Sequence, residues 1–431
     1  MTTLTLERLR HLVREDRVHR DVYIDPAIFA LEMERIHGRA WVYVGHTSQV
    51  PYPGDYVTTT IGLQPVIMSR HSDGTVHVLH NRCGHRGAKV LNQERGSAPQ
   101  FRCLYHGWAY ATDGELLAVP LPDFYPAGYD LADRRLGLAP AARVESYRGF
   151  VFASLAPDAV DLRTHLGRAT DLIDELVNRS PEGEVEVFGG RLRYEIRGNW
   201  KLQAENLADQ YHVPFGHEST ASRDGYQFQR RTGERGARAR VLSEDGNPYL
   251  QESGTWAWPH GFNANGAMHF DGAQSGPVWE TYRASMVAAY GANRAETYMR
   301  VKHHNALLYP NLDLHMLGML IRVIRPVAVD RTEVTIYPVR LKGAPAEMAR
   351  DVIKLANITH SATSLIQTDD VESFERCQAG LQSQGSEWVD FVRGQGRDAD
   401  DPAWGGRYGP ITSEIGMRNQ HRAWLDYMGA A

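Results

Sequence analysis

Two short segments that each offer one cysteine and one histidine constrain this chain more than any other feature. The first is Cys83-x-His85, and after a gap of 17 residues the second is Cys103-x-x-His106. Together they use two of the only three cysteines in 431 residues. Two thiolates and two imidazoles can hold a tetrahedral Zn²⁺ or an iron–sulfur cluster. Because glycines 84, 87 and 107 surround them, we expect both segments to form tight loop tips.

The way the ligands are divided favours iron–sulfur over zinc. Zinc fingers usually pair cysteine with cysteine and histidine with histidine, whereas each segment here offers one of each. A Rieske [2Fe–2S] centre binds one iron through two cysteines and the other through two histidines, which raises its reduction potential to about −150 to +300 mV. A structural zinc site and a chance grouping stay open as alternatives. Cys377 has no nearby partner of this kind, and we interpret it as structural.

Composition excludes several other classes of protein. The 42% hydrophobic content suffices for a large core and two domains, and the net charge of −5 offers no basic surface for nucleic acid. No run reaches the roughly 18 apolar residues of a membrane helix, and the first twenty residues lack a secretory apolar segment. Three cysteines exclude a disulfide framework. We expect a cytoplasmic protein that binds neither nucleic acid nor membrane.

The pattern of elements predicts a small β domain inserted near the front of a larger α+β domain. Residues 25–41 read as a helix, with Asp25 as N-cap and Pro26 at its first position. Residues 41–160 contain short β-branched runs and two Asp-Gly hairpin signals. Residues 344–381 form one long helical pattern. The predicted boundaries are 1–40 for an N-terminal helix of the larger domain, 41–160 for the inserted domain and 161–431 for the rest.

A second candidate metal site lies at His212 and His217. Two histidines and one carboxylate on one face of a metal are typical of mononuclear Fe(II) oxygenases. Five positions along a straight helix place these imidazoles roughly 140° apart, so a break is required, and Pro214 can supply it. Asp369 and Asp370, in a later helical segment, both offer the missing carboxylate, and on a helix they point about 100° apart.

These residues resemble the catalytic α subunits of Rieske non-haem iron ring-hydroxylating oxygenases. "CGHRGA" and "CLYHGWAY" fit that family, as does its N-W-K…E-N…D-x-Y-H-x4-H stretch, which is matched by Asn199, Trp200, Lys201, Glu205, Asn206, Asp209, Tyr211, His212 and His217. The resemblance covers almost the whole chain. It implies an all-β Rieske domain within a catalytic domain whose central antiparallel sheet is flanked by helices, in a helix-grip-like arrangement.

The resemblance also assigns cofactors and ligands. It implies one Rieske cluster held by Cys83, His85, Cys103 and His106, and one mononuclear Fe(II) held by His212, His217 and Asp370. Asp370 is preferred to Asp369 because the family's ligand is followed by Glu five and Gln eight positions on, as Glu375 and Gln378 follow Asp370.

Partners follow from the same resemblance. Asp209 is expected to relay electrons to a Rieske histidine of a neighbouring subunit, which implies a trimeric ring, and a small β subunit would complete an α3β3 hexamer. The sequence holds no G-x-G-x-x-G after a strand and no P-loop. NAD(P)H should therefore bind a partner reductase, which delivers electrons directly or through a ferredoxin.

The resemblance implies O₂-dependent cis-dihydroxylation in the catabolism of an aromatic compound. Residues 413–429 are similar to the tails of α subunits that act on aromatic acids, so an aromatic carboxylate is the expected substrate. Arg322, Arg240 or Gln203 could anchor its carboxylate. The expected pocket residues, each of which could equally be ordinary core, are Gln203, Asn206, Phe215, Leu308 and Leu317. A Rieske monooxygenase, an O- or N-demethylase and a pure electron-transfer protein remain alternatives.

Overall fold

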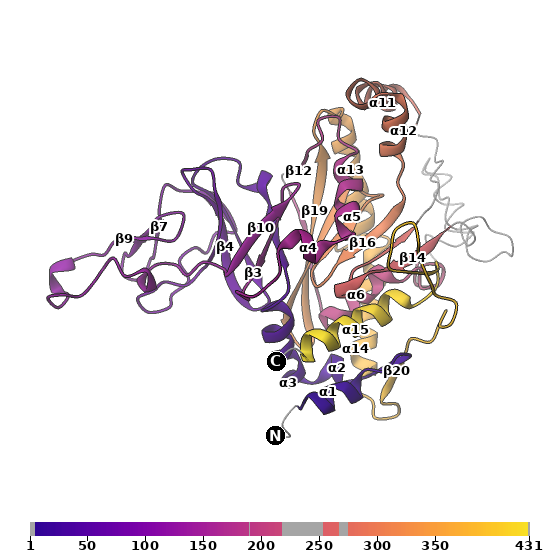
Figure 1. Ribbon diagram of the computed structural model, residues 1–431, viewed down its shortest axis with the longest axis horizontal. Helices are drawn as coiled ribbons and strands as arrows, with labels where there is room; N and C mark the ends of the chain where they lie inside the picture. The colour runs from indigo at the N-terminus through magenta and orange to yellow at the C-terminus, as the bar shows by residue number, and fades with distance from the viewer. Residues whose placement is uncertain (1–4, 189, 218–252, 267–274, 430–431) are drawn as a thin grey trace. The chain divides into compact units, whose positions relative to one another are not determined.

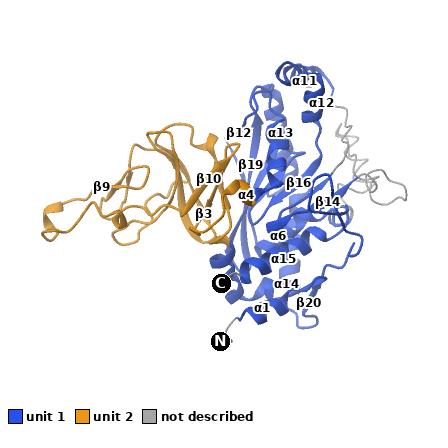
Figure 2. Cartoon of the chain, viewed as in Figure 1, with its two compact units in different colours: residues 1–36, 166–431 blue, residues 37–165 orange. Residues whose placement is uncertain are grey.

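The computed structural model describes residues 5–188, 190–217, 253–266 and 275–429. The chain forms two compact units: unit 1 comprises residues 1–36 and 166–431, and unit 2 comprises residues 37–165 (Figure 2). Unit 2 is thus inserted into unit 1 along the sequence, and the predicted inserted segment 41–160 falls inside it. Among the described residues, no helix is long and apolar enough to cross a membrane.

Unit 2 consists of small antiparallel sheets (Figure 1). The strand orders are β10-β11-β2, β5-β4-β3-β6 and β7-β8-β9. The Asp-Gly hairpin signal at Asp73 is confirmed, since Asp73 accepts a hydrogen bond from Thr75 N at 2.8 Å and Gly74 has a φ of +87°. The strands are β2 (Val42–His46), β3 (Asp55–Ile61), β4 (Gln64–Arg70), β5 (Val76–His80), β6 (Arg95–Ser97), β7 (Phe101–Arg102), β8 (Ala109–Tyr110), β9 (Leu116–Ala118), β10 (Arg143–Tyr147) and β11 (Phe150–Ser154).

Unit 1 is built on a ten-stranded antiparallel sheet, so the predicted α+β class is confirmed. The strand order is β12-β19-β18-β17-β16-β15-β14-β22-β21, with β13 also paired to β19, and β1 (Arg17–His19) pairs separately with β20 (Trp388–Asp390). The sheet strands are β12 (Val185–Val187), β13 (Leu192–Ile196), β14 (Gly254–Ala257), β15 (Asn263–Gly266), β16 (His303–Leu308), β17 (Leu312–His315), β18 (Leu320–Ala328), β19 (Arg331–Leu341), β21 (Ala399–Asp400) and β22 (Arg407–Pro410).

Helices pack on this sheet and carry the candidate metal ligands (Figure 1). Near the N-terminus, Asp25 caps α3 through a 2.8 Å hydrogen bond from Ala27 N, as predicted. The helices are α1 (Leu6–Leu12), α2 (Asp21–Ile24), α3 (Pro26–Glu32), α5 (Ala169–Val177), α6 (Trp200–Ala208), α7 (Val213–Gly216), α11 (Pro277–Tyr290), α12 (Ala292–Met299), α13 (Ala346–His360), α14 (Gln367–Gly380) and α15 (Ile415–Gly429), while α4 (Leu162–Leu166) lies at the boundary between the units.

The single helix predicted over residues 344–381 is wrong, because the segment forms two helices, α13 and α14. Ser364 lies in the break, and its hydroxyl oxygen accepts a 2.9 Å hydrogen bond from Gln367 N at the start of α14. A serine side chain that binds the backbone locally competes with helix continuation, which periodicity alone does not reveal. After the break, α14 begins three residues before Asp370.

Buried polar contacts fix α6 within unit 1. The Asn199 side chain caps the helix by accepting from Lys201 N at 3.1 Å, and Asn199 N donates to Gln378 of α14 at 2.9 Å. Lys201 pairs at 2.5 Å with Glu32 of α3, which also accepts hydrogen bonds from the indoles of Trp200 and Trp424. The two indole donors help to offset the cost of burying the Glu32 carboxylate.

Candidate metal centres and active site

The two Cys/His loops of unit 2 have the same backbone hydrogen-bond pattern. In each loop the cysteine N–H donates to the carbonyl five residues on, and the cysteine carbonyl accepts from a glycine four residues on. The bonds are Cys83 N to Ala88 O (2.8 Å), Gly87 N to Cys83 O (3.0 Å), Cys103 N to Trp108 O (2.8 Å) and Gly107 N to Cys103 O (2.9 Å). Both glycines have a φ of +74°, which side chains other than glycine rarely adopt. The loops are therefore two copies of one tight turn.

The cysteines and the histidines of these loops lie at different depths. Cys83 and Cys103 are buried, at 2% and 1% exposure, whereas His85 is exposed and His106 half-buried. The two imidazole rings are 4.5 Å apart between centroids. Two inner thiols and two outer imidazoles fit a [2Fe–2S] cluster with one all-cysteine iron and one all-histidine iron. A zinc site has no need of that separation.

Aromatic side chains support both kinds of ligand. His85 stacks on Trp108 with ring centroids 5.0 Å apart and an interplanar angle of 7°. The Tyr110 hydroxyl lies 3.0 Å from Cys83 Sγ and accepts from Gly84 N at 3.1 Å. Burial, followed by the hydrogen bond to Cys83, raises the pKa of Tyr110, so its hydroxyl stays protonated and can donate to a thiolate sulfur. The sequence analysis did not single out this tyrosine, although it lies within the "CLYHGWAY" motif.

In unit 1, one ligand atom each from His212, His217 and Asp370 lies within 4.8 Å of the others. Asp370 Oδ1 is 3.5 Å from His212 Nε2 and 3.3 Å from His217 Nε2. Burial opposes ionisation of Asp370, but its hydrogen bond to His217 and the charges of His217, His212 and Arg322 hold its pKa below the usual range. Two imidazoles and an ionised carboxylate that converge on one point fit a divalent iron with open positions.

The break that allows this convergence is not where the sequence analysis placed it. Helix α6 ends at Ala208, and His212 and His217 flank the short helix α7, in which Pro214 takes the second position. Asp209 makes the turn: its backbone is extended, and its Oδ1 accepts from Tyr211 N at 2.6 Å and His212 N at 3.3 Å. Asp209 is thus a turn residue, and its Oδ2 lies 3.2 Å from His212 Nδ1.

The adjacent aspartates of α14 both approach His217, from opposite sides of its ring. Asp370 faces Nε2, whereas Asp369 Oδ2 is 3.3 Å from Nδ1. Burial lowers the pKa of His217, but hydrogen bonds and charges from both aspartates outweigh it and raise that pKa. Asn206 of α6 donates at 3.0 Å to Asp370 Oδ1 and lies 3.2 Å from His212 Nε2. The geometry therefore groups Asp370 with the two imidazoles and leaves Asp369 to orient His217.

Comparison with protein families assigns both units. Residues 185–430 match the model of the ring hydroxylating alpha subunit catalytic domain. Residues 40–127 match the Rieske [2Fe-2S] domain. The chain belongs to the α subunits of the ring-hydroxylating oxygenases. The family that the sequence motifs resemble is thereby confirmed, as is the expectation of an oxidoreductase.

Similar proteins cover nearly all of this α subunit. Toluate 1,2-dioxygenase subunit alpha of Pseudomonas putida is 34% identical over 99% of this chain and 95% of its own length. Anthranilate 1,2-dioxygenase large subunit of Acinetobacter baylyi is 35% identical over 88% of this chain and 80% of its own. The structure of naphthalene 1,2-dioxygenase with indole bound in the active site superposes with a TM-score of 0.84 at 27% identity, over 97% of this chain and 94% of that one.

The expected pocket residues differ in their burial and in their contacts. Asn206 contacts His212 and Asp370, two members of the candidate metal triad His212, His217 and Asp370. The Gln203 amide oxygen accepts from the buried Tyr194 hydroxyl at 2.9 Å. Leu308 is buried on β16 and Leu317 is half-buried, whereas Phe215 is 68% exposed. Of the expected carboxylate anchors, Arg322 is buried, and Arg240 lies outside the described residues.

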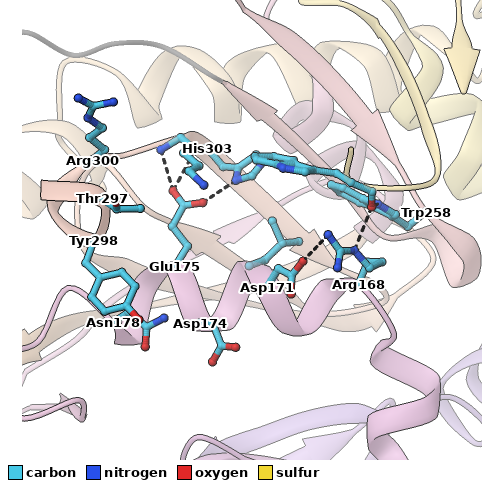
Figure 3. A pocket seen from close by; sticks show the side chains of 13 residues that line it. Arg168, Asp171, Asp174, Glu175, Asn178, Trp258, Thr297, Tyr298, Arg300 and His303 are labelled. Atoms are coloured by element: carbon cyan, nitrogen blue, oxygen red, sulfur yellow. Dashed lines mark hydrogen bonds and ion pairs between the residues drawn. The ribbon is translucent and has the colours of Figure 1, made fainter. Parts of the chain in front are cut away.

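A separate cavity of about 290 Å³ in unit 1 contains none of the triad residues. His303 and Glu175 form its buried centre: His303 Nδ1 is 2.7 Å from Glu175, which also accepts from the backbone N–H groups of Lys302 and His303 (Figure 3). Trp258 and Trp404 line it together with residues of α5 and α12. Its lining carries three acidic residues and three basic ones, Arg168, Arg300 and Lys302.

Proposed function

We propose that this chain is the catalytic α subunit of a terminal oxygenase that cis-dihydroxylates an aromatic carboxylate, with electrons from an NAD(P)H-dependent reductase. The observation that carries the proposal is the convergence of His212, His217 and Asp370 in a chain that also holds the paired Cys/His loops. An acid substrate is supported by the relatives named for toluate and anthranilate, which both bear a carboxylate on an aromatic ring.

We assign the cofactors as one Rieske cluster on Cys83, His85, Cys103 and His106, and one mononuclear Fe(II) on the triad. The mononuclear iron, when bound, supplies the open coordination positions that O₂ chemistry requires. The chain's own side chains hold the proposed iron ligands in position. Asn206 donates a hydrogen bond to Asp370, and Asp369 and Asp209 lie against the outer nitrogens of His217 and His212. Such outer partners fix the ring orientation of metal-binding histidines.

We further propose that Asp209 connects to a Rieske histidine of a neighbouring subunit. Its position beside His212 Nδ1 supports this role, since a carboxylate can bridge two imidazoles. A trimeric ring of such chains, joined by a small β subunit as α3β3, is the assembly we propose. The relatives' names, subunit alpha and large subunit, are consistent with it. Ferredoxin or flavin reductase partners would meet this assembly in the cytoplasm.

Product analysis under ¹⁸O₂ tests the proposal. The purified oxygenase, supplied with a surrogate reductase and a panel of benzoates, should yield a cis-diol acid that carries two labelled oxygen atoms. A product with one labelled atom, or formaldehyde released from a methoxy or N-methyl substrate, would instead establish a monooxygenase or demethylase. If the Rieske cluster is reduced but no oxygenated product forms, the chain acts as an electron carrier only.

A further inference from the structure

Arg322 of β18 is a buried cation whose donors are largely unused. It is 7% exposed and lies directly across from Asp313 of β17 in the sheet register. Among the described residues, only one guanidinium nitrogen has a close partner, His360 Nε2 at 2.6 Å. Nη1 is 3.6 Å from Asp313, too far for a good hydrogen bond, and Nε has no hydrogen-bond partner in the part of the chain that the structure describes. Guanidinium offers five N–H donors, so this one has capacity for a further anion.

The surroundings of Arg322 contain further unsatisfied polar atoms. Among the described residues, Asp313 and Asn305, both buried, each carry a side-chain oxygen without a hydrogen-bond partner. Buried polar atoms are nearly always bonded to protein, water or ligand. Their position on β16 and β17, next to the strand of Arg322, therefore indicates a polar site that a small molecule or water completes.

This polar site adjoins the metal triad. The charge of Arg322 contributes to the lowered pKa of Asp370 and acts on Tyr194 as well. Tyr194 donates to Gln203 of α6, the helix that also carries Asn206. In the sheet, Val334 of β19 pairs with Tyr194 on one side and with Ile324 on the other. Ile324 is two residues from Arg322 along β18. Tyr194 and Arg322 therefore lie on the same face of the sheet. Arg322 thus lies on the sheet face that carries Tyr194, within electrostatic range of Asp370.

We propose that Arg322 binds the carboxylate of the aromatic acid substrate and thereby holds the ring at the metal triad. The inference rests on the proposed function, of which it names the specificity-determining residue. A planar guanidinium suits a carboxylate because two parallel N–H···O bonds can form. His360 faces one N–H of Nη2, so the remaining N–H of Nη2 and a neighbouring nitrogen can form the fork. Asp313 competes for the same cation, and so its negative charge limits how tightly an acid binds.

Anaerobic calorimetric titration of the holoenzyme with benzoate and with the neutral isostere benzamide tests the proposal without turnover. Arg322→Gln should weaken benzoate binding by about 10- to 100-fold, the range for loss of a charge-assisted hydrogen bond. The same substitution should change the affinity for benzamide by less than about threefold. Arg322→Lys, which keeps the charge but loses the fork, should give an intermediate value. Asp313→Asn should tighten benzoate binding, because it removes the competing anion.

Arg325 offers a matched control on the same strand. It pairs with Glu333 at 2.7 Å and is more exposed, so Arg325→Gln should leave both affinities unchanged. Equal weakening of benzoate and benzamide in Arg322→Gln, or an unchanged preference for benzoate, would overturn the inference. If the unaltered enzyme itself shows no preference for acids over neutral isosteres, the proposed substrate class fails first. The cluster absorbance and iron content of each variant report whether it has folded.

Discussion

Asp370 Oδ1 lies 3.3 Å from His217 Nε2, while the adjacent Asp369 contacts the other nitrogen of the same ring, also at 3.3 Å. One imidazole is thus held between two neighbouring carboxylates that have different tasks. We propose that the first belongs to the metal triad and that the second fixes the orientation of the ring.

Substitution should separate these two tasks. Asp370→Asn should remove the mononuclear iron, so that the iron content falls from about three to about two per chain, the two of the cluster. Asp369→Asn should only weaken metal affinity or turnover, by about 10- to 100-fold, as is typical for outer partners of metal ligands. Iron analysis together with the visible cluster spectrum measures both effects.

The cluster spectrum is the internal control for that experiment, because its ligands lie in unit 2 and both aspartates lie in unit 1. It should be the same in both variants. Loss of the mononuclear iron from Asp369→Asn alone, with full occupancy in Asp370→Asn, would exchange the roles of the two residues.

Tyr110 should raise the reduction potential of the Rieske cluster. Its hydroxyl, 3.0 Å from Cys83 Sγ, donates to a sulfur that becomes more negative on reduction. Tyr110→Phe removes that donor and should lower the potential by on the order of 50–100 mV, the equivalent of one hydrogen bond to a charged group. Spectroelectrochemical titration measures the shift. A variant with an intact cluster and an unchanged potential would show that the hydroxyl acts only on Gly84.

Asp209→Asn should slow electron delivery while both metals remain bound. The amide still offers an oxygen to Tyr211 N and His212 N, so the turn is retained, but the charge beside His212 Nδ1 is lost. We expect reoxidation of the reduced cluster by O₂ and substrate to slow by at least about 10- to 100-fold, the usual effect of losing such a partner. Stopped-flow absorbance follows it, and iron analysis of the same sample checks that both metals remain bound. Normal reoxidation in Asp209→Asn would leave Asp209 a turn residue only.

Local sequence patterns predicted the features that depend only on residues close together in the chain. Paired Cys/His loops, the Asp25 cap and the Asp73-Gly74 turn depend on residues within a few positions of one another, and the structure forms each of them. The break between α13 and α14 was missed because it depends on the Ser364 side chain binding the backbone rather than on hydrophobic period.

Long-range pairing explains what else was missed. The opposition of Asp313 and Arg322 depends on the register of β17 and β18, and the contact with His360 depends on how α13 packs. Local periodicity of the sequence predicts neither contact. The contacts of Asp370 with both imidazoles also depend on long-range packing rather than on local periodicity. Residues alone left Asp369 and Asp370 equivalent, and the family resemblance supplied the preference that the geometry of α14 and α7 also gives.

The buried carboxyl of Asp313 should leave a signature in the pH dependence of stability. Burial raises its pKa from 3.8 to about 6, although Arg322 opposes the shift. Between these values the folded chain holds more of this proton than the unfolded chain, so the free energy of unfolding decreases as pH rises from about 4 to about 6. The full effect is on the order of 3 kcal/mol. Asp313→Asn cannot ionise and should lack this decrease, so the difference in melting temperature between variant and unaltered enzyme should grow in favour of the variant over that range. Parallel curves from pH 4 to 7 would mean that Asp313 is ionised at its ordinary pKa and fully compensated by Arg322, which would leave the guanidinium with less capacity for a substrate carboxylate.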